Sequence, residues 1–374
     1  MEIDKISIGT EATFLPPFEN GIKTVKRLEE TGYASLWWAD HLMGWIPESI
    51  WTPDIINVAA YQKTPHFFFE AYTTIAVAAW NTERVKLGTS VTETFRRHPS
   101  VLAQSFLTLD HLSKGRVILG IGAGEGENVI PYGIEWNKPV SRLEEAIKII
   151  KLLWKNDKKV DFDGNFWKLK DAILAMGPYK NGEYPPIWIG AHGPKMLELT
   201  GKLGDGWLPA NLDLNSYKKG LKIIQESAKK VGKNLDNFTP ALWCYAILDE
   251  DHEGCLNMLE APLIKCLALV MSHEKFNQYG ISHPLGENYR GLFDFIPTRV
   301  DRKTVLEAIE KIPKKMCEDI YLYGTPDEII GKIEEYAKVG LKHIVIQNAT
   351  IFSGVKEIKT SFNCLKKVLN YFNG

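Results

Sequence analysis

The sequence predicts an α/β protein, a (β/α)8 TIM barrel with an insertion between its seventh and eighth strands. Two observations lead to this fold class. Short runs typical of buried strands recur eight times, and stretches with helical periodicity separate nearly all of them. Such alternation predicts a parallel sheet, and eight units favour a closed barrel over an open doubly wound sheet. A length of 374 residues suits a large barrel, so we expect residues 1–374 to form one domain.

The expected elements of the first half follow one another in a regular order. A strand over residues 3–9 leads to a helix over 20–31, which Gly32 can end as a C-terminal cap. The next strand begins at Ser35 and stops before Asp40, and the long aromatic loop after it is of a kind that is often functional. The remaining elements of this half are helices over 67–80, 99–112 and 141–154, a strand with its loop over 85–92, and a strand over 116–122.

The second half continues the alternation after a hairpin excursion at residues 162–169. Strands over 186–190, 206–209 and 241–248 are separated by a helix that begins near Pro194 and a helix over 217–231. Residues 249–319 are mixed in character and carry Pro262, Pro284 and Pro297, so we interpret them as an insertion at the rim that covers or shapes a pocket. A helix over 326–339, a strand over 343–347 and a last helix over 355–372 complete the chain.

Composition excludes several functional classes. Lys and Arg number 45 against 46 for Asp and Glu, and a net charge of -1 gives no electrostatic footprint for nucleic acid. We see no apolar run long enough to cross a bilayer and no signal peptide, which predicts a cytoplasmic protein. The five cysteines are widely spread and form no Cys-x-x-Cys pair, so we expect reduced thiols and no metal site.

Asp40, His41 and Trp45 follow the second strand, at the end where ligands collect in parallel barrels. His41 is the side chain best suited to move a proton near neutral pH. Asp40 can orient that histidine or bind a ligand donor, and Trp45 can form an apolar wall. A structural histidine and a core tryptophan remain the competing interpretation.

Glycines recur at alternate positions from Gly120 to Gly126, which invites comparison with a dinucleotide-binding loop. The spacing does not match that motif, because Glu125 and Glu127 fall where its third glycine belongs. The run instead suits a strand end where a flat ligand lies against the backbone. Glu125 would then reach the same rim as His41 as a second acid–base group, although a solvated loop glutamate is the alternative.

Gly193, Pro194 and Lys195 open a helix after the strand over 186–190. Free N–H groups at a helix start attract an anion, and proline is tolerated in the first turn. Lys195 adds positive charge, so this turn is a candidate site for a cofactor phosphate. An ordinary helix start explains the same residues.

Together these stretches resemble the bacterial-luciferase-like flavin and deazaflavin oxidoreductases. The resemblance rests on Asp40-His41 with Trp45, on residues 88–92 with Phe95-Arg96, on residues 122–125 with Asn128, and on residues 190–194. The pattern is most similar to the F420-dependent branch, which includes F420-dependent glucose-6-phosphate dehydrogenase, secondary alcohol dehydrogenase and methylenetetrahydromethanopterin reductase. Residues 279–299 are similar to the branch that reduces ketones of complex lipids.

The resemblance implies a role for each matched position. His41, Trp45 and Glu125 correspond to the family's catalytic residues. Positions that hold the deazaflavin correspond to Asp40, Ser90, Val91, Thr92, Ala123, Gly124 and Asn128, and those that hold its phosphate to His192, Gly193, Lys195 and Met196. The family's non-proline cis peptide bond, which presses on the middle of the ring, falls at Ser90–Val91. A homodimer is also implied.

The function expected from this resemblance is hydride transfer between the C5 atom of F420 and a second substrate. That substrate would be a small or lipid-like alcohol or ketone, or a methylene-tetrahydropterin. The glucose-6-phosphate enzyme holds its substrate with a threonine and a lysine where this chain has Ala210 and Asp213, so sugar phosphates are not expected. Two alternatives stay open, an FMN-dependent luciferase-like monooxygenase and a non-catalytic protein that binds the cofactor.

Overall fold

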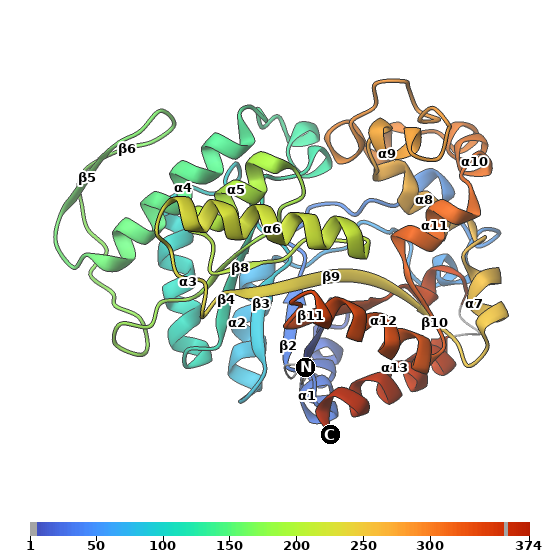
Figure 1. The fold of residues 1–374 in the computed structure, drawn as a ribbon, viewed down its shortest axis with the longest axis horizontal. Coiled ribbons are helices and arrows are strands. Elements are labelled where there is room, and N and C mark those ends of the chain that lie inside the picture. Colours follow the sequence, from blue (N-terminus) through green and yellow to red (C-terminus); the bar gives the residue numbers. More distant parts are fainter. Residues whose placement is uncertain (1–5, 355–357) are drawn as a thin grey trace.

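The structure, a computed structural model, describes residues 6–354 and 358–374 (Figure 1). At its centre, eight parallel strands pair with their neighbours in chain order, and the β11–β1 and β8–β9 pairs close the circle. The strands are β1 (Ser7–Glu11), β2 (Ser35–Trp38), β3 (Lys86–Thr89), β4 (Val117–Ile121), β7 (Ile187–Ile189), β8 (Gly206–Trp207), β9 (Thr239–Leu248) and β11 (His343–Asn348). The predicted (β/α)8 barrel is therefore confirmed.

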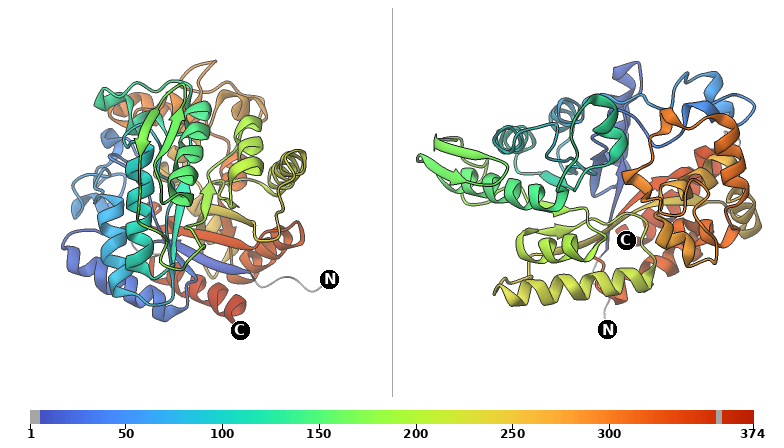
Figure 2. Two further views of the ribbon diagram at one scale, coloured as in Figure 1. Left: turned by 90° about the vertical axis from the view of Figure 1, so that its left-hand side faces the viewer. Right: turned by 90° about the horizontal axis from the view of Figure 1, so that it is seen from above.

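Helices connect the strands and surround the barrel (Figure 2). They are α1 (Phe18–Thr31), α2 (Ala71–Asn81), α3 (Pro99–Ser113), α4 (Pro139–Lys155), α5 (Pro194–Leu203), α6 (Leu214–Lys230), α12 (Pro326–Lys338) and α13 (Ile358–Asn373). Gly32 ends α1 with a φ of 101°, as its position predicted, because glycine adopts this left-handed conformation without steric cost. Thr325 and Glu328 form a capping box that starts α12.

Several boundaries differ from those expected. The first strand begins at Ser7, and residues 3–5 of the predicted strand lie outside the described residues, as do residues 355–357 of the last helix. The helix predicted from residue 67 begins at Ala71, because the Glu70 carboxylate accepts a hydrogen bond from the Thr73 N–H group at 2.7 Å and caps it. The prediction missed β10 (Leu322–Gly324), a short strand that pairs with the C-terminal end of β9.

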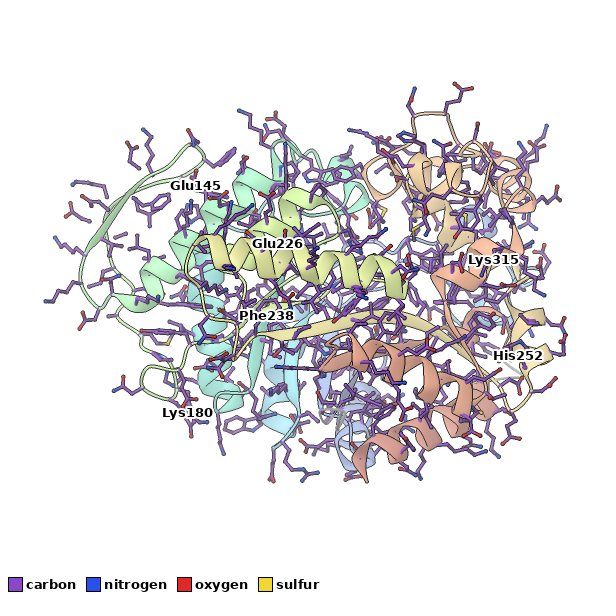
Figure 3. All side chains as sticks on the ribbon, in the orientation of Figure 1. Glu145, Lys180, Glu226, Phe238, His252 and Lys315 are labelled. Atoms are coloured by element: carbon purple, nitrogen blue, oxygen red, sulfur yellow. The ribbon has the colours of Figure 1, made fainter. Side chains whose placement is uncertain are left out.

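The predicted hairpin is present as the antiparallel pair β5 (Val160–Asp163) and β6 (Lys168–Ala172), which extends away from the barrel in Figure 1. Glu145 on α4, labelled in Figure 3, anchors its turn. The Glu145 carboxylate accepts hydrogen bonds from the N–H groups of Asn165, Phe166 and Trp167 at 2.7–2.9 Å.

Aromatic side chains fill the interior of the barrel beneath its C-terminal rim. The rings of Trp37 and Trp188 lie 5.2 Å apart inside it, and both residues are buried. Glycines make this packing possible, since a Cβ atom at Gly88 would lie 2.4 Å from Trp37 and one at Gly206 would lie 2.5 Å from Trp188. Burial lowers the pKa of His343, beneath these rings, to about 3. Because the interior of the barrel is filled with side chains, ligands can bind only at its ends, and in parallel barrels they bind at the C-terminal rim.

Residues 249–319 form short helices between β9 and β10, seen along the right-hand side of Figure 1. They are α7 (His252–Met258), α8 (Pro262–Cys266), α9 (His273–Asn277), α10 (Arg302–Glu310) and α11 (Lys314–Ile320). Their buried side chains form a second hydrophobic core together with Ile46, Ile50 and Trp51 from the loop after β2. This segment therefore packs directly against a loop of the C-terminal rim.

Two sequence expectations concern the whole chain. Within the described ranges, no helix is both long and apolar enough to cross a lipid bilayer. All five cysteines are buried and free, in agreement with the expected reduced thiols.

Candidate functional site

The polar residues singled out in the sequence follow strands β2, β3, β4 and β7 of the barrel. Because all these strands are parallel, their C-terminal ends meet at one rim. The rim also receives Glu11 from the end of β1 and Tyr245 from the last half of β9.

His41 and Glu125 form the centre of the site. The His41 Nε2 atom lies 3.3 Å from a Glu125 carboxylate oxygen, and the two side chains are 16% and 33% exposed. The other ring nitrogen of His41, Nδ1, lies 3.2 Å from the Met43 carbonyl oxygen. Both ring nitrogens thus face oxygen atoms, which fixes the orientation of the imidazole. The sequence predicted these two side chains at one rim, and the structure brings them together.

The Ser90–Val91 peptide bond is cis, as the resemblance implied. Val91 packs against two glycines that follow neighbouring strands. A Cβ atom at Gly122 would lie 2.8 Å from the Val91 side chain, and one at Gly190 would lie 3.4 Å from it. The absence of side chains at these two positions leaves a smooth surface around Val91 that a planar ligand can approach.

Asp40 is not free to bind a ligand in this structure. The residue is 4% exposed, and its Oδ2 atom accepts hydrogen bonds from the Thr92 hydroxyl and from Arg97, each at 2.6 Å. Arg96 adds an ion pair at 3.1 Å, and the Thr92 hydroxyl also lies 2.7 Å from the Tyr72 hydroxyl. Asp40 and Thr92 therefore form a buried support beneath the rim.

Asn128 joins two rim loops. Its side-chain oxygen accepts hydrogen bonds from the backbone N–H groups of Leu42 at 2.6 Å and Met43 at 3.3 Å. Ala123 and Gly124 lie between the end of β4 and this asparagine, and the Ala123 carbonyl oxygen accepts from the Trp136 indole at 3.0 Å. These contacts fix the loop that bears Glu125 against the loop that bears His41.

The turn from His192 to Met196 has the features of an anion site. Gly193 is the N-cap of α5 and provides no side-chain cap, and a Cβ atom there would meet nothing within 4 Å. Lys195 is exposed in the first turn, while Met196 is buried and anchors the helix. His192 is held by the backbone of Ala210, whose carbonyl oxygen lies 2.8 Å from its Nε2 atom.

Trp45 lines the rim through its ring. Its indole N–H donates to the Tyr245 hydroxyl at 2.8 Å, and the ring meets Phe352 edge-on at 5.8 Å between centroids. The indole nitrogen is thus already paired, which leaves Trp45 an apolar surface as its contribution to the site.

Two acids without a predicted role lie at this rim, the half-buried Glu11 and the buried Glu127. The Glu11 Oε1 atom accepts hydrogen bonds from the Ser90 hydroxyl and from the Trp243 indole, the latter at 3.0 Å. Burial raises the pKa of Glu11 to about 7. Burial, together with the nearby charge of Glu125, raises the pKa of Glu127 well above its ordinary value. The position of Glu11 at a strand end was a usable signal, whereas nothing in the sequence indicated that Glu127 points inward.

A cavity of about 580 Å³ lies at the opposite end of the barrel. It is lined by residues that precede strands β7, β8 and β9, among them Phe238, which Figure 3 labels. None of the predicted site residues lines it. In parallel barrels this end serves stability rather than ligand binding, so the C-terminal rim remains the candidate site.

Comparison with known proteins supports the predicted resemblance. A sequence model of the family described as luciferase-like monooxygenase matches residues 5–343. The chain is 34% identical over 341 residues to phthiodiolone/phenolphthiodiolone dimycocerosates ketoreductase of Mycobacterium bovis, a match covering 90% of this chain and 89% of the relative. It is 30% identical over 275 residues to 5,10-methylenetetrahydromethanopterin reductase of Archaeoglobus fulgidus, covering 73% of this chain and 80% of the relative.

The fold has a close parallel among solved structures. An F420-dependent secondary alcohol dehydrogenase in complex with an F420-acetone adduct superposes with a TM-score of 0.74 at 23% identity, over 97% of this chain and 98% of that one. This likeness confirms the barrel. The two sequence relatives, both named as reductases, agree with the prediction of an oxidoreductase.

Proposed function

This chain belongs to the luciferase-like monooxygenase family, and from that premise we propose that it is an F420-dependent oxidoreductase. It would transfer a hydride between the C5 atom of the deazaflavin and the carbonyl carbon of an apolar ketone, or in reverse from the alcohol. The observation on which this proposal rests is the His41–Glu125 pair at 3.3 Å, on the same rim as the smooth surface around Val91.

The residues present fit such a cofactor. Gly122 and Gly190 make room for the Val91 side chain, because a Cβ atom at Gly122 would lie 2.8 Å from it and one at Gly190 would lie 3.4 Å from it, and no other side chain from these two positions stands beside Val91. Gly193 and the open start of α5 offer backbone N–H groups to a phosphate, and Lys195 offers a charge. We propose that these two places hold the ring and the phosphate of F420.

The chain's own groups would perform the proton transfer. When bound, the deazaflavin supplies the carbon that gives or accepts the hydride. Reduction of a ketone places negative charge on the substrate oxygen, and His41 in its protonated form donates a proton there. Glu125 orients the imidazole and stabilises its positive charge through the Nε2 contact. Trp45 confines the reacting carbon with its apolar ring.

Exposed apolar side chains favour a ketone or alcohol with an apolar tail. Four of them lie on loops at the rim, namely Leu42, Ile130, Tyr132 and Phe293. Phe293 belongs to the inserted segment and stacks on Trp136 of the loop after β4, with centroids 4.4 Å apart. Exposed apolar residues that gather beside a polar site are typical of surfaces that bind apolar ligands. One sequence relative is named as a ketoreductase of phthiodiolone and phenolphthiodiolone dimycocerosates.

A sugar phosphate fits the site poorly. Asp213 caps α6, with its carboxylate accepting from the Ser216 N–H at 3.0 Å, so negative charge is fixed on the loop after β8. A methylene-tetrahydropterin remains the other substrate class, and the Archaeoglobus relative is named for it. We favour the ketone and alcohol class because of the apolar rim.

Three further proposals concern the context of the enzyme. We propose that the chain is one barrel domain in which residues 249–319 form an insertion that shapes one side of the substrate pocket. We also propose a homodimer, by resemblance to the family. The buried, free cysteines support a cytoplasmic location.

Turnover with reduced F420 tests the proposed function. Purified protein would be given reduced F420 and a series of methyl ketones of increasing chain length, and formation of oxidised F420 would be followed by absorbance. We expect kcat/KM to rise with chain length. Phe293→Ser should lower kcat/KM for long ketones more than for acetone, whereas Phe362→Ser, an exposed phenylalanine on α13, should lower neither. The proposal would be contradicted if the protein turned over only methylene-tetrahydropterin, or if it turned over neither ketones nor alcohols.

A further inference from the structure

Glu127 is a buried carboxyl group inside the candidate site. It lies in the 3₁₀ turn Gly126–Asn128 after β4 and is 1% exposed. The inserted segment covers this turn, since a Cβ atom at Gly126 would lie 2.7 Å from the Phe293 carbonyl oxygen. One side-chain atom each from His41, Glu125 and Glu127 lie within 4.8 Å of one another. Glu127 therefore extends beneath the rim towards the pair assigned to proton transfer.

The Glu127 carboxyl group has little to stabilise a negative charge. Its Oε1 atom accepts one long hydrogen bond, from the Asn128 amide at 3.3 Å. Its Oε2 atom is closed to solvent and has no hydrogen-bond partner among the described residues. Arg96 faces it from the loop after β3, but this guanidinium is already paired with Glu93 at 2.5 Å and with Asp40 at 3.1 Å.

Two carboxyl groups whose oxygen atoms lie within 4.8 Å of each other, one of them buried, do not both ionise readily, because each negative charge disfavours the other. The titratable and charged groups that face Glu127 are Glu125 from its own loop, His41 from the loop after β2, and Arg96. From the inserted segment, the turn meets the backbone carbonyl oxygens of Leu292 and Phe293, which add no positive charge. The proton therefore stays on the more buried carboxyl group.

We infer that Glu125 and Glu127 share one proton, and that Glu127 is a positioning residue that returns a proton through Glu125 to His41 after each reduction. This inference rests on the proposed function. Each ketone reduced would need one hydride, which bound deazaflavin would supply, and one proton, which His41 gives to the substrate oxygen. The proton shared by the two carboxyl groups then passes to His41, and solvent replaces it at the partly exposed Glu125.

The first test reads the shared proton without any turnover. Infrared spectra of the protein without cofactor would be recorded at pH 8 in a Glu11→Gln background and compared between variants, so that Glu11, whose pKa is also raised, does not contribute. We expect a protonated-carboxyl band that Glu127→Gln removes and that Glu135→Gln, an exposed acid on the same stretch, retains. Absence of the band would overturn the inference. Its appearance only after EDTA treatment would also overturn it, because that result would mean that a cation binds between the carboxylates.

The second test separates proton return from simple packing. In single variants with Glu11 intact, Glu127→Gln keeps the shape of the side chain, so we expect unchanged F420 Kd and substrate KM. The kcat for ketone reduction should fall by about tenfold, below the range expected for losing a direct proton donor. The alkaline limb of the kcat–pH profile should also move. A wild-type kcat and profile in Glu127→Gln would show that Glu127 only fills space. If the infrared band is present and no substrate turns over with F420, the proposed function fails while the shared proton stands.

Discussion

Glu11→Gln should make the stability of the protein less dependent on pH. The Glu11 Oε1 atom is bonded to Ser90 and Trp243, but its Oε2 atom is closed to solvent without a partner among the described residues. Burial outweighs the hydrogen bonds to this carboxyl group and raises the pKa of Glu11 from 4.5 to about 7. Glutamine resembles the protonated acid in shape and charge, so it can keep the Oε1 contacts at every pH.

The sign and size of the effect follow from this pKa. A carboxyl group whose pKa is raised in the folded protein favours folding in its protonated form. That contribution is fully present below pH 4.5 and is lost as pH rises to about 7. The shift corresponds to about 3 kcal/mol, because one pKa unit corresponds to about 1.4 kcal/mol. The free energy of unfolding of Glu11→Gln, relative to wild type, should therefore rise by up to about 3 kcal/mol between pH 4.5 and pH 8.

Urea unfolding at a series of pH values measures this difference directly. Glu30→Gln provides a matched control, because Glu30 is exposed at the end of α1 and its replacement should leave the difference flat. A constant difference between Glu11→Gln and wild type across the range would refute the reasoning. It would mean that water or a relaxed side chain solvates the Oε2 atom in solution.

Three further predictions concern the site. His41→Ala and Glu125→Gln should each lower kcat by about 10²–10⁴-fold with little change in F420 Kd, as steady-state rates and fluorescence titration would show; normal turnover in both would refute the catalytic assignment. Lys195→Ala should raise the F420 Kd about fivefold, which corresponds to about 1 kcal/mol for an exposed charge. The control Lys202→Ala, at the far end of α5, should leave the Kd unchanged, and equal effects of the two variants would exclude a phosphate at the helix start. Glucose 6-phosphate should not be oxidised, because the Asp213 carboxylate repels its phosphate, and turnover above background would contradict that argument.

The barrel was predictable because it depends on periodicity along the chain. Apolar runs and amphipathic stretches reflect local burial, and their alternation leaves few topologies for a chain of this length. The juxtaposition of His41 and Glu125 follows from the same logic, since both residues come after parallel strands of one barrel. The missed strand β10 is three residues long and has too little pattern to be recognised.

The partners of individual side chains were less predictable. Asp40 is adjacent to His41 in sequence, yet its carboxylate faces Arg96 and Arg97, which come from the loop after another strand. Glu125 and Glu127 look alike in the sequence, but the inserted segment buries one and leaves the other partly exposed. Such differences arise from contacts between segments far apart in the chain, which periodicity does not report.

Cofactor choice tests the central claim most directly. The protein, freed of any ligand, would be titrated with F420 and with FMN while quenching of its tryptophan fluorescence is followed. The account predicts micromolar or tighter binding of F420 and much weaker binding of FMN. Equal affinities, or tight binding of FMN alone, would contradict it and identify the protein as a flavin enzyme of the same barrel family.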